Sequence, residues 1–139
     1  MIVTISDNGE FQKMRKGLDS AIKMGLARAT AGQELAIKTR TARGYGLKGK
    51  FSKYSDGYKA FRRKKGRKVS PVNLHFTGRM LASIQWTANK RRGKIFLSSS
   101  SEKKKAAWTH ADRPWWGITQ KEQSLINKQF NKGFRAKMR

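Results

Sequence analysis

The charge of this chain is the feature that most restricts what it can be. Lys and Arg together number 33 and Asp and Glu together number 8, so the formal net charge is +25 over 139 residues. Repulsion among so many like charges weakens a compact state, and a domain that acts alone does not need it. We therefore expect a polyanionic partner, which is nucleic acid, an acidic protein surface or an anionic membrane.

The length and the aromatic content indicate one folded domain over residues 1–139. A chain of this size can build one modest core and not two. Its 4 Trp, 7 Phe and 3 Tyr can fill that core, whereas a disordered basic tail would be poorer in aromatic residues. The chain has no Cys, which excludes disulfides and thiolate metal sites.

No targeting or membrane signal stands out. The first residues lack a basic segment followed by an apolar stretch, so we expect no signal peptide. No apolar run approaches the ~20 residues that a membrane span needs. We expect a protein that is made and used in a cytoplasm, without a membrane partner.

The N-terminal third is predicted to be a long helix. Residues 2–5 are β-branched and could form an edge strand, and Asp7 and Asn8 are plausible helix caps. Apolar residues then recur at steps of three and four, which places them on one helical face; they are Phe11, Met14, Leu18, Ile22, Leu26 and Ala29. A helix of roughly 25–30 residues is long for a small domain. It either spans the core or packs against a neighbouring subunit.

Residues 41–68 differ from the rest of the chain, because eleven Lys or Arg stand there against one acid, Asp56, with five glycines. No sustained period of 2 or 3.6 is present, so we expect a long, mobile, basic loop at about 41–70. Interleaved aromatics suit a phosphate backbone and its bases, or else anchor the loop to the domain; they are Tyr45, Phe51, Tyr54, Tyr58 and Phe61.

The C-terminal half is predicted to hold a hairpin and a final helix. Thr77 could cap a short helix in the apolar segment 80–84, and alternation from Ile84 to Ala88 followed by a return at 95–97 indicates a hairpin with a basic tip. We expect a polar connector at 98–105, a helical turn at 106–112 and an apolar knot at 113–118. Thr119 and Glu122 match a capping box, after which one helical face carries Leu125, Ile126, Gln129, Phe130 and Phe134.

The basic residues of the loop and of the hairpin tip are the expected contacts with nucleic acid or an acidic partner. They are Arg43, Lys48, Lys50, Lys53, Lys59, Arg62, Arg63, Lys64, Lys65, Arg67, Lys68, Arg91 and Arg92.

The residue types that catalysis needs are sparse. The two histidines, His75 and His110, are far apart in sequence, and we expect each to be a polar or packing residue. The acids stand singly and form no cluster that suggests Mg²⁺. The glycines at 44, 46 and 49 do not match a phosphate loop. We expect neither an enzyme nor a cofactor.

Two segments carry a resemblance to a known family. The run Leu74–Ile84, which contains Thr77, Gly78 and Arg79, resembles the "LTGRL–SI" segment of phage virion-morphogenesis and tail-completion proteins, the head–tail connector or neck family. The run Arg113–Glu122 is similar to the "RPFLGLSDED" segment of the same family; it begins with Arg113, Pro114, Trp115, Trp116 and Gly117. The segment that the family often has between hairpin and second motif is shortened here.

The expected fold is α+β: a small antiparallel sheet of about three or four strands with a long N-terminal helix, a C-terminal helix and an extended basic loop. The resemblance implies a ring-forming subunit of a virion, made in the host cytoplasm and placed at the head–tail junction. It would join or cap the tail beside other neck, portal-side or tail proteins, with genomic DNA possible in the channel. Composition alone favours the alternative, a ribosomal or nucleoid type of nucleic-acid-binding protein. Trp115 and Trp116 fill either the core or an intersubunit groove.

Overall fold

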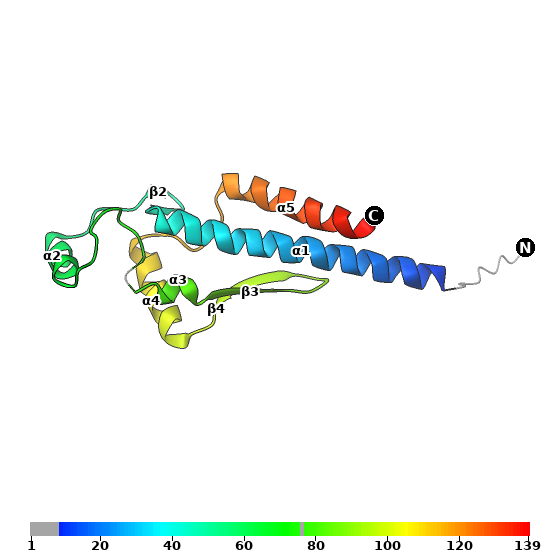
Figure 1. The fold of residues 1–139 in the computed structure, drawn as a ribbon, viewed down its shortest axis with the longest axis horizontal. Helices are drawn as coiled ribbons and strands as arrows, with labels where there is room; N and C mark the ends of the chain where they lie inside the picture. The colour runs from blue at the N-terminus through cyan, green and yellow to red at the C-terminus, as the bar shows by residue number, and fades with distance from the viewer. Residues whose placement is uncertain (1–8, 76) are drawn as a thin grey trace, which may run out of the picture.

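The computed structural model describes residues 9–75 and 77–139 and has an α+β fold. Its longest element is the helix α1 (Glu10–Ala42), which runs along most of the molecule's length (Figure 1). The helix α5 (Gln120–Met138) lies along one side of α1, and a β-hairpin lies along the other side. The expected α+β class, with a long N-terminal and a C-terminal helix, is confirmed.

Helix α1 is longer than the sequence pattern predicted. Its 33 residues extend over about 50 Å at the usual rise. Gly9 caps its start in the left-handed region at φ 85°, and Gly44 follows its end at φ 86°. The caps expected at Asp7 and Asn8, and the strand expected at residues 2–5, lie outside the described residues.

The packing of α1 against α5 depends on small residues. A Cβ atom at Gly25 would lie 2.8 Å from the ring of Phe130, and one at Gly133 would lie 2.7 Å from the carbonyl oxygen of Met24. These glycines therefore let the two antiparallel backbones approach closely. The start of α5 is fixed by the capping box that the sequence predicted, in which Thr119 accepts from the backbone of Glu122 and Glu122 accepts from the backbone of Thr119.

The predicted apolar face of α1 is only partly buried. Phe11, Met14 and Leu18 are 64%, 69% and 45% exposed, because α5 ends before it reaches the first turns of α1 (Figure 1). The fully buried positions of α1 are small or lie further along, such as Ala21, Ala29 and Ile37. The three apolar residues that begin the predicted helical face are therefore left outside the packed part of α1.

The strands form two separate ribbons instead of one sheet of three or four strands. β1 (Tyr45–Gly46) pairs with β2 (Gly49–Lys50), and β3 (Ile84–Ala88) pairs with β4 (Gly93–Leu97), both antiparallel. The predicted hairpin is thus confirmed, with Ile84 opposite Leu97 and Ala88 opposite Gly93. The prediction of a larger sheet was wrong, because the two ribbons lie at different places in the fold. Helix α1, rather than a further strand, packs on β3 and β4.

The stretch expected to be an irregular basic loop contains a helix, α2 (Asp56–Lys64). The hydroxyl of Ser55 caps it by accepting from the backbone of Tyr58. Phe51 and Tyr54 are buried just before it and tie the segment to the rest of the fold. Apolar periodicity did not reveal this helix, because its buried residue is Arg62 and its exposed positions mix acidic, aromatic and basic side chains. The mobility expected of residues 41–70 remains a prediction.

The helical turn expected at 106–112 is part of a longer helix, α4 (Ser100–Asp112), which also includes most of the expected polar connector at 98–105. The short helix expected after Thr77 is present as α3 (Arg79–Ala82), with Gly78 at its cap position and no side-chain cap from Thr77. The hydroxyl of Ser99 caps α4 by accepting from the backbone of Glu102. The serine run that reads as a connector therefore supplies a helix start.

The core is small and lies where the C-terminal end of α1 meets α3, α4 and the strands. Its buried members come from nearly every element; they are Ile37, Phe51, Met80, Leu81, Ile84, Leu97, Ala106 and Trp115. Both motif segments contribute to this cluster, so it is the place to look for what those motifs do.

Candidate functional site

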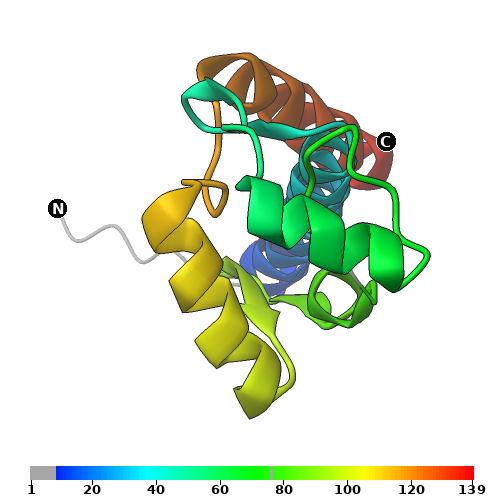
Figure 2. The ribbon, with the colours of Figure 1, turned by 90° about the vertical axis from the view of Figure 1, so that its left-hand side faces the viewer.

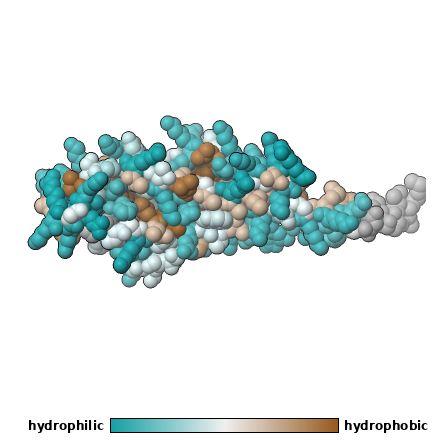
Figure 3. Space-filling model, in the orientation of Figure 1, coloured by the Kyte–Doolittle hydropathy of each residue, from teal (hydrophilic) through white to brown (hydrophobic). Residues whose placement is uncertain are grey.

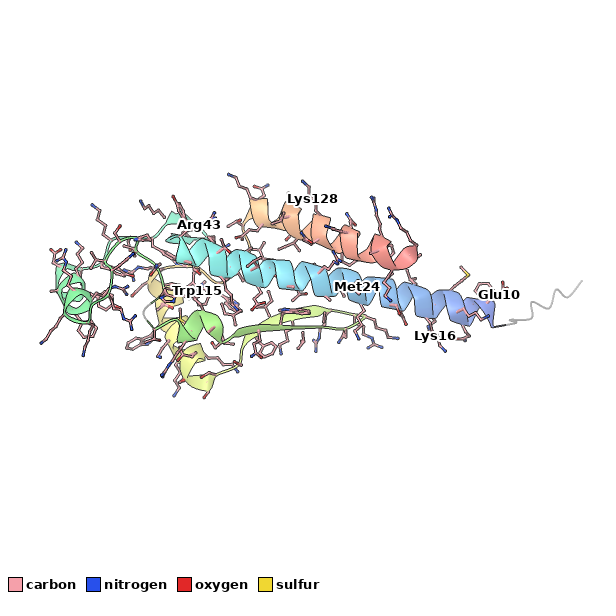
Figure 4. All side chains as sticks on the ribbon, viewed as in Figure 1. Glu10, Lys16, Met24, Arg43, Trp115 and Lys128 are labelled. Carbon is pink, nitrogen blue, oxygen red and sulfur yellow. The ribbon has the colours of Figure 1, made fainter. Side chains whose placement is uncertain are left out.

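Trp115 joins the two motif segments. It is 0% exposed and lies between α1 and α4 in Figure 4. Its Nε1 donates to the hydroxyl of Thr109 at 3.2 Å, and that hydroxyl lies 3.8 Å from the sulfur of Met80, in the first motif. Trp116 packs edge-on against it at 5.3 Å between ring centroids and is only partly buried. Trp115 is therefore core, and the intersubunit alternative fails for this residue.

The backbone of the knot is held by two side chains from other helices. Arg40 donates to the carbonyl oxygens of Trp115 at 2.6 Å and of Gly117 at 3.2 Å, and it forms a largely buried ion pair with Glu122. The Nδ1 of His110 accepts from the backbone N–H groups of Trp115 and Trp116, each at 3.2 Å. His110 is thus a packing residue, as expected. No feature of the sequence singled out Arg40 among the other cations of α1.

The remaining motif residues shape turns or lie at the surface. Gly117 has φ 149°, and a Cβ there would lie 3.1 Å from Leu47. The carbonyl oxygen of Pro114 accepts from the backbone of Leu47 at 2.8 Å, which ties the knot to the first ribbon. Gly78 has φ 81° at the start of α3, while Thr77 and Arg79 are exposed there.

Arg113 lies between the knot and α2. Its guanidinium carbon is 5.4 Å from the ring centroid of Tyr54, and its Nε is buried without a hydrogen-bond partner among the described residues. Tyr54 donates to the carbonyl oxygen of Asn73 at 2.5 Å. The second motif thereby anchors the base of the basic segment through an aromatic ring.

Arg62 departs from the partner contact expected of it. The residue is 4% exposed, and its guanidinium lies 5.0 Å from the ring centroid of Tyr54. It donates to the carbonyl oxygens of Lys68 at 2.8 Å and His75 at 3.4 Å. Arg62 therefore faces inward and holds α2 and the following turn together, and it has little surface to offer a partner.

The other cations of this segment form a basic end of the molecule, at the left of Figure 1. Figure 3 shows hydrophilic residues gathered over that end. Asp56 and Lys59 form an exposed pair at 2.9 Å, and the hydrogen bond from Lys59 holds the pKa of Asp56 below its usual range. The exposed cations of α2 and the turn after it, which we call the α2 basic patch, are Arg63, Lys64, Lys65, Arg67 and Lys68.

The structure does not bring all predicted contact residues together. Lys53 precedes α2, and Arg43, Lys48 and Lys50 are exposed around the first ribbon at the end of α1. Arg91 and Arg92 lie at the tip of the second hairpin, which points away from α2 along α1 (Figure 1). There Lys90 pairs with Asp19 at 2.9 Å. The expected contacts therefore form at least two separate basic surfaces.

Two searches of the described residues bear on the class of site. In residues 9–75 and 77–139, no group of three or more His, Asp or Glu side chains is placed to hold a metal ion. Within the same ranges, no helix is long and apolar enough to cross a membrane.

Comparison with family models, with curated proteins and with solved structures finds no match to this chain.

Proposed function

We propose that the chain is a structural subunit of a bacteriophage head–tail junction, which assembles as a ring and joins or caps the tail. The observation that supports this best is that the two segments resembling the tail-completion family pack on each other. Met80, Leu81 and Ile84 of the first share one core cluster with Trp115 of the second. Segments that resemble one family and also form one structural unit support that family more strongly than either alone.

The surface also suits a subunit of an assembly. Phe11, Met14 and Leu18 form an exposed apolar stripe at the end of α1 that extends beyond α5, near Glu10 in Figure 4. Contiguous exposed apolar residues on a small protein commonly mark a contact with another protein. We take this stripe, in place of the Trp115–Trp116 knot, as the ring-forming surface of the proposed subunit. In a ring, the stripe of one copy must contact a different surface of the next copy.

The test of assembly uses the stripe directly. The double substitution Phe11→Ser with Met14→Ser should lower the ring population in native mass measurements and in electron micrographs, with little change in unfolding stability because both side chains are exposed. The matched control is Leu35→Ser, since Leu35 is 65% exposed on the same helix outside the stripe. Equal loss of rings in both variants would contradict a specific interface.

The test of place uses the virus that encodes the chain. Removing the gene should leave filled heads and separate or unstable tails, and purified particles should contain the protein at their junction. Normal infectious particles from the deletion would refute the proposal.

A basic nucleic-acid-binding protein of the ribosomal or nucleoid type is the second candidate, and the α2 basic patch favours it. If Arg63, Lys64 and Lys65 neutralise one phosphate each, changing all three to Gln should reduce the slope of log affinity against log salt by about 2.7 on duplex DNA. Arg62 stays unchanged, because it is buried and its loss would confound folding with binding.

The matched control for this triple variant is Lys121, Lys128 and Lys132 changed to Gln, three exposed cations of α5 (Lys128 in Figure 4). The neck proposal predicts that the α2 triple variant still folds and still joins particles, with slower assembly, since charge mainly sets encounter rate and register. If that variant alone loses tight DNA binding together with all biological activity, the nucleic-acid-binding candidate replaces the neck proposal.

A further inference from the structure

A cavity of about 740 Å³ lies between α2 and α4, beside the start of α3. The two helices lie at the end of the molecule that faces the viewer in Figure 2. The volume is in the range of small-molecule sites. Met80 of the core and Arg113 of the knot form part of its wall, while neither the ring-forming stripe nor the α2 basic patch lines it.

Aromatic rings from both helices line the cavity. Trp108 of α4 is 84% exposed, the most exposed of the large apolar residues in the part of the chain that the structure describes. Tyr58 of α2 is 39% exposed, and the buried Tyr54 lies 5.0 Å from it, edge-on. Arg62 and Arg113 cover Tyr54. The ring of Tyr58 is also contacted, by the Arg62 guanidinium at 5.9 Å and by Phe61 at 6.0 Å between centroids, so Trp108 has the ring face available to a ligand.

The charges of the cavity are mixed. Lys53 and Lys105 bring ammonium groups to it, while Glu102 and Asp112 bring carboxylates from α4. Lys105 pairs with one carboxylate oxygen of Glu102 at 2.9 Å. The residue as a whole is only 6% exposed. Its other carboxylate oxygen is buried and has no hydrogen-bond partner among the described residues. A buried carboxylate oxygen without a donor is costly, and a bound donor would relieve that cost.

These features together restrict the ligand. It must present a negative group to the lysines, a flat ring to Trp108, and an N–H donor to Glu102 after a small side-chain rotation. An acidic peptide of Asp and Glu meets the lysines but has no flat ring to stack on Trp108. A nucleotide has all three parts, because its phosphate is anionic, its base stacks on aromatic rings, and adenine, cytosine and guanine carry N–H donors.

We propose that this cavity binds an unpaired nucleotide of a single-stranded nucleic acid. The base stacks on Trp108, a phosphate contacts Lys53 and Lys105, and an amino group of the base donates to Glu102. A paired base cannot enter, since both of its faces are stacked on neighbouring base pairs in the duplex. The proposal does not depend on ring assembly and goes beyond a structural role.

The experiment titrates the full chain with oligodeoxycytidine and oligothymidine of equal length, at fixed salt and with excess duplex DNA as competitor. The duplex occupies the α2 basic patch, so the remaining binding reports the cavity. Cytosine has an amino donor and thymine does not, and so oligodeoxycytidine should bind more tightly. The substitution Trp108→Ala should weaken this binding by about tenfold, the usual range for loss of one stacked base. Trp108 is largely exposed, so the variant should fold.

The matched control is Trp86→Ala, because Trp86 is a partly exposed tryptophan of β3 outside the cavity. It should leave the affinity unchanged, while Glu102→Met, which keeps the length of the side chain but has no oxygen acceptor, should remove the preference for cytosine. Equal effects of Trp108→Ala and Trp86→Ala, or complete displacement by duplex, would overturn the proposal. Tight binding of polyglutamate that is lost in Trp108→Ala would also overturn it and assign the cavity to an acidic peptide.

Discussion

The substitution Trp115→Ala tests whether the second motif acts inside one chain or between chains. Trp115 is fully buried, and its Nε1 bonds to Thr109. Removing a buried Trp side chain costs about 3–5 kcal/mol, because apolar burial is lost and a cavity remains. Proteins of this size are stable by only ~5–15 kcal/mol. We therefore expect a loss that is a large fraction of the total free energy of unfolding.

Two further variants make the result interpretable. Trp115→Phe keeps much of the ring volume and loses the bond to Thr109, so it should cost about 1–2 kcal/mol. Trp108→Ala removes an exposed tryptophan and should stay within about 0.5 kcal/mol of the natural chain. Urea unfolding of the three variants, followed by circular dichroism and compared at equal m-value, gives the free energies of unfolding. If Trp115→Ala is as stable as Trp108→Ala but no longer assembles, Trp115 acts in an interface and the assignment to the core is refuted.

Two other predictions concern the packing of α1. Gly133→Ala should lower the free energy of unfolding, although Ala has the better helix propensity, because the new Cβ would meet the backbone of Met24. The control Gly17→Ala has open space around the new Cβ and should gain about 0.5–1 kcal/mol. Equal gains in both variants would refute the close approach of α1 and α5. Arg40→Leu should cost about 2–4 kcal/mol, because it leaves Glu122 and two carbonyl oxygens of the knot without their donor. Lys38→Leu breaks only a surface pair and should change stability by less than about 0.5 kcal/mol, and similar losses in both would contradict the role of Arg40.

Patterns with a local physical cause could be predicted from the sequence. The capping box at Thr119 and the hairpin from Ile84 depend on residues close in the chain, and both are present as expected. Helix α2 was missed, and only the second half of α4 was expected as a helical turn. Both helices start at a serine cap, Ser55 or Ser99, but they bury too few apolar side chains for apolar periodicity to reveal them. Helix periodicity needs a buried face of several residues, and in α2 only Arg62 is buried.

What depended on distant contacts could not be predicted. The apolar period of α1 continues through Phe11, yet only the position where α5 ends decides that this part is exposed. Likewise, Arg62 is one of several cations in a run, and only the placement of Tyr54 beneath it makes it an interior residue. The cavity beside α2 was not predicted either, because its two walls come from α2 and α4, which are separated in the sequence by α3, β3 and β4.

The excess charge predicts how the proposed ring should respond to salt. Among the described residues, ion pairs engage five of the eight acids in the chain, so few carboxylates remain to offset 33 cations. The paired acids are Asp19, Glu34, Asp56, Glu102 and Glu122. Subunits that meet through an apolar stripe must therefore overcome mutual repulsion, which is screened over about 10 Å at 0.1 M salt and about 3 Å at 1 M. Rings measured by native mass or sedimentation should become more populated as salt rises, or when a polyanion is added at low salt. Apolar contact is not weakened by this screening, whereas contact through ion pairs is. A ring population that falls steadily with salt would show that charge pairs, not the stripe at Phe11, hold the subunits together.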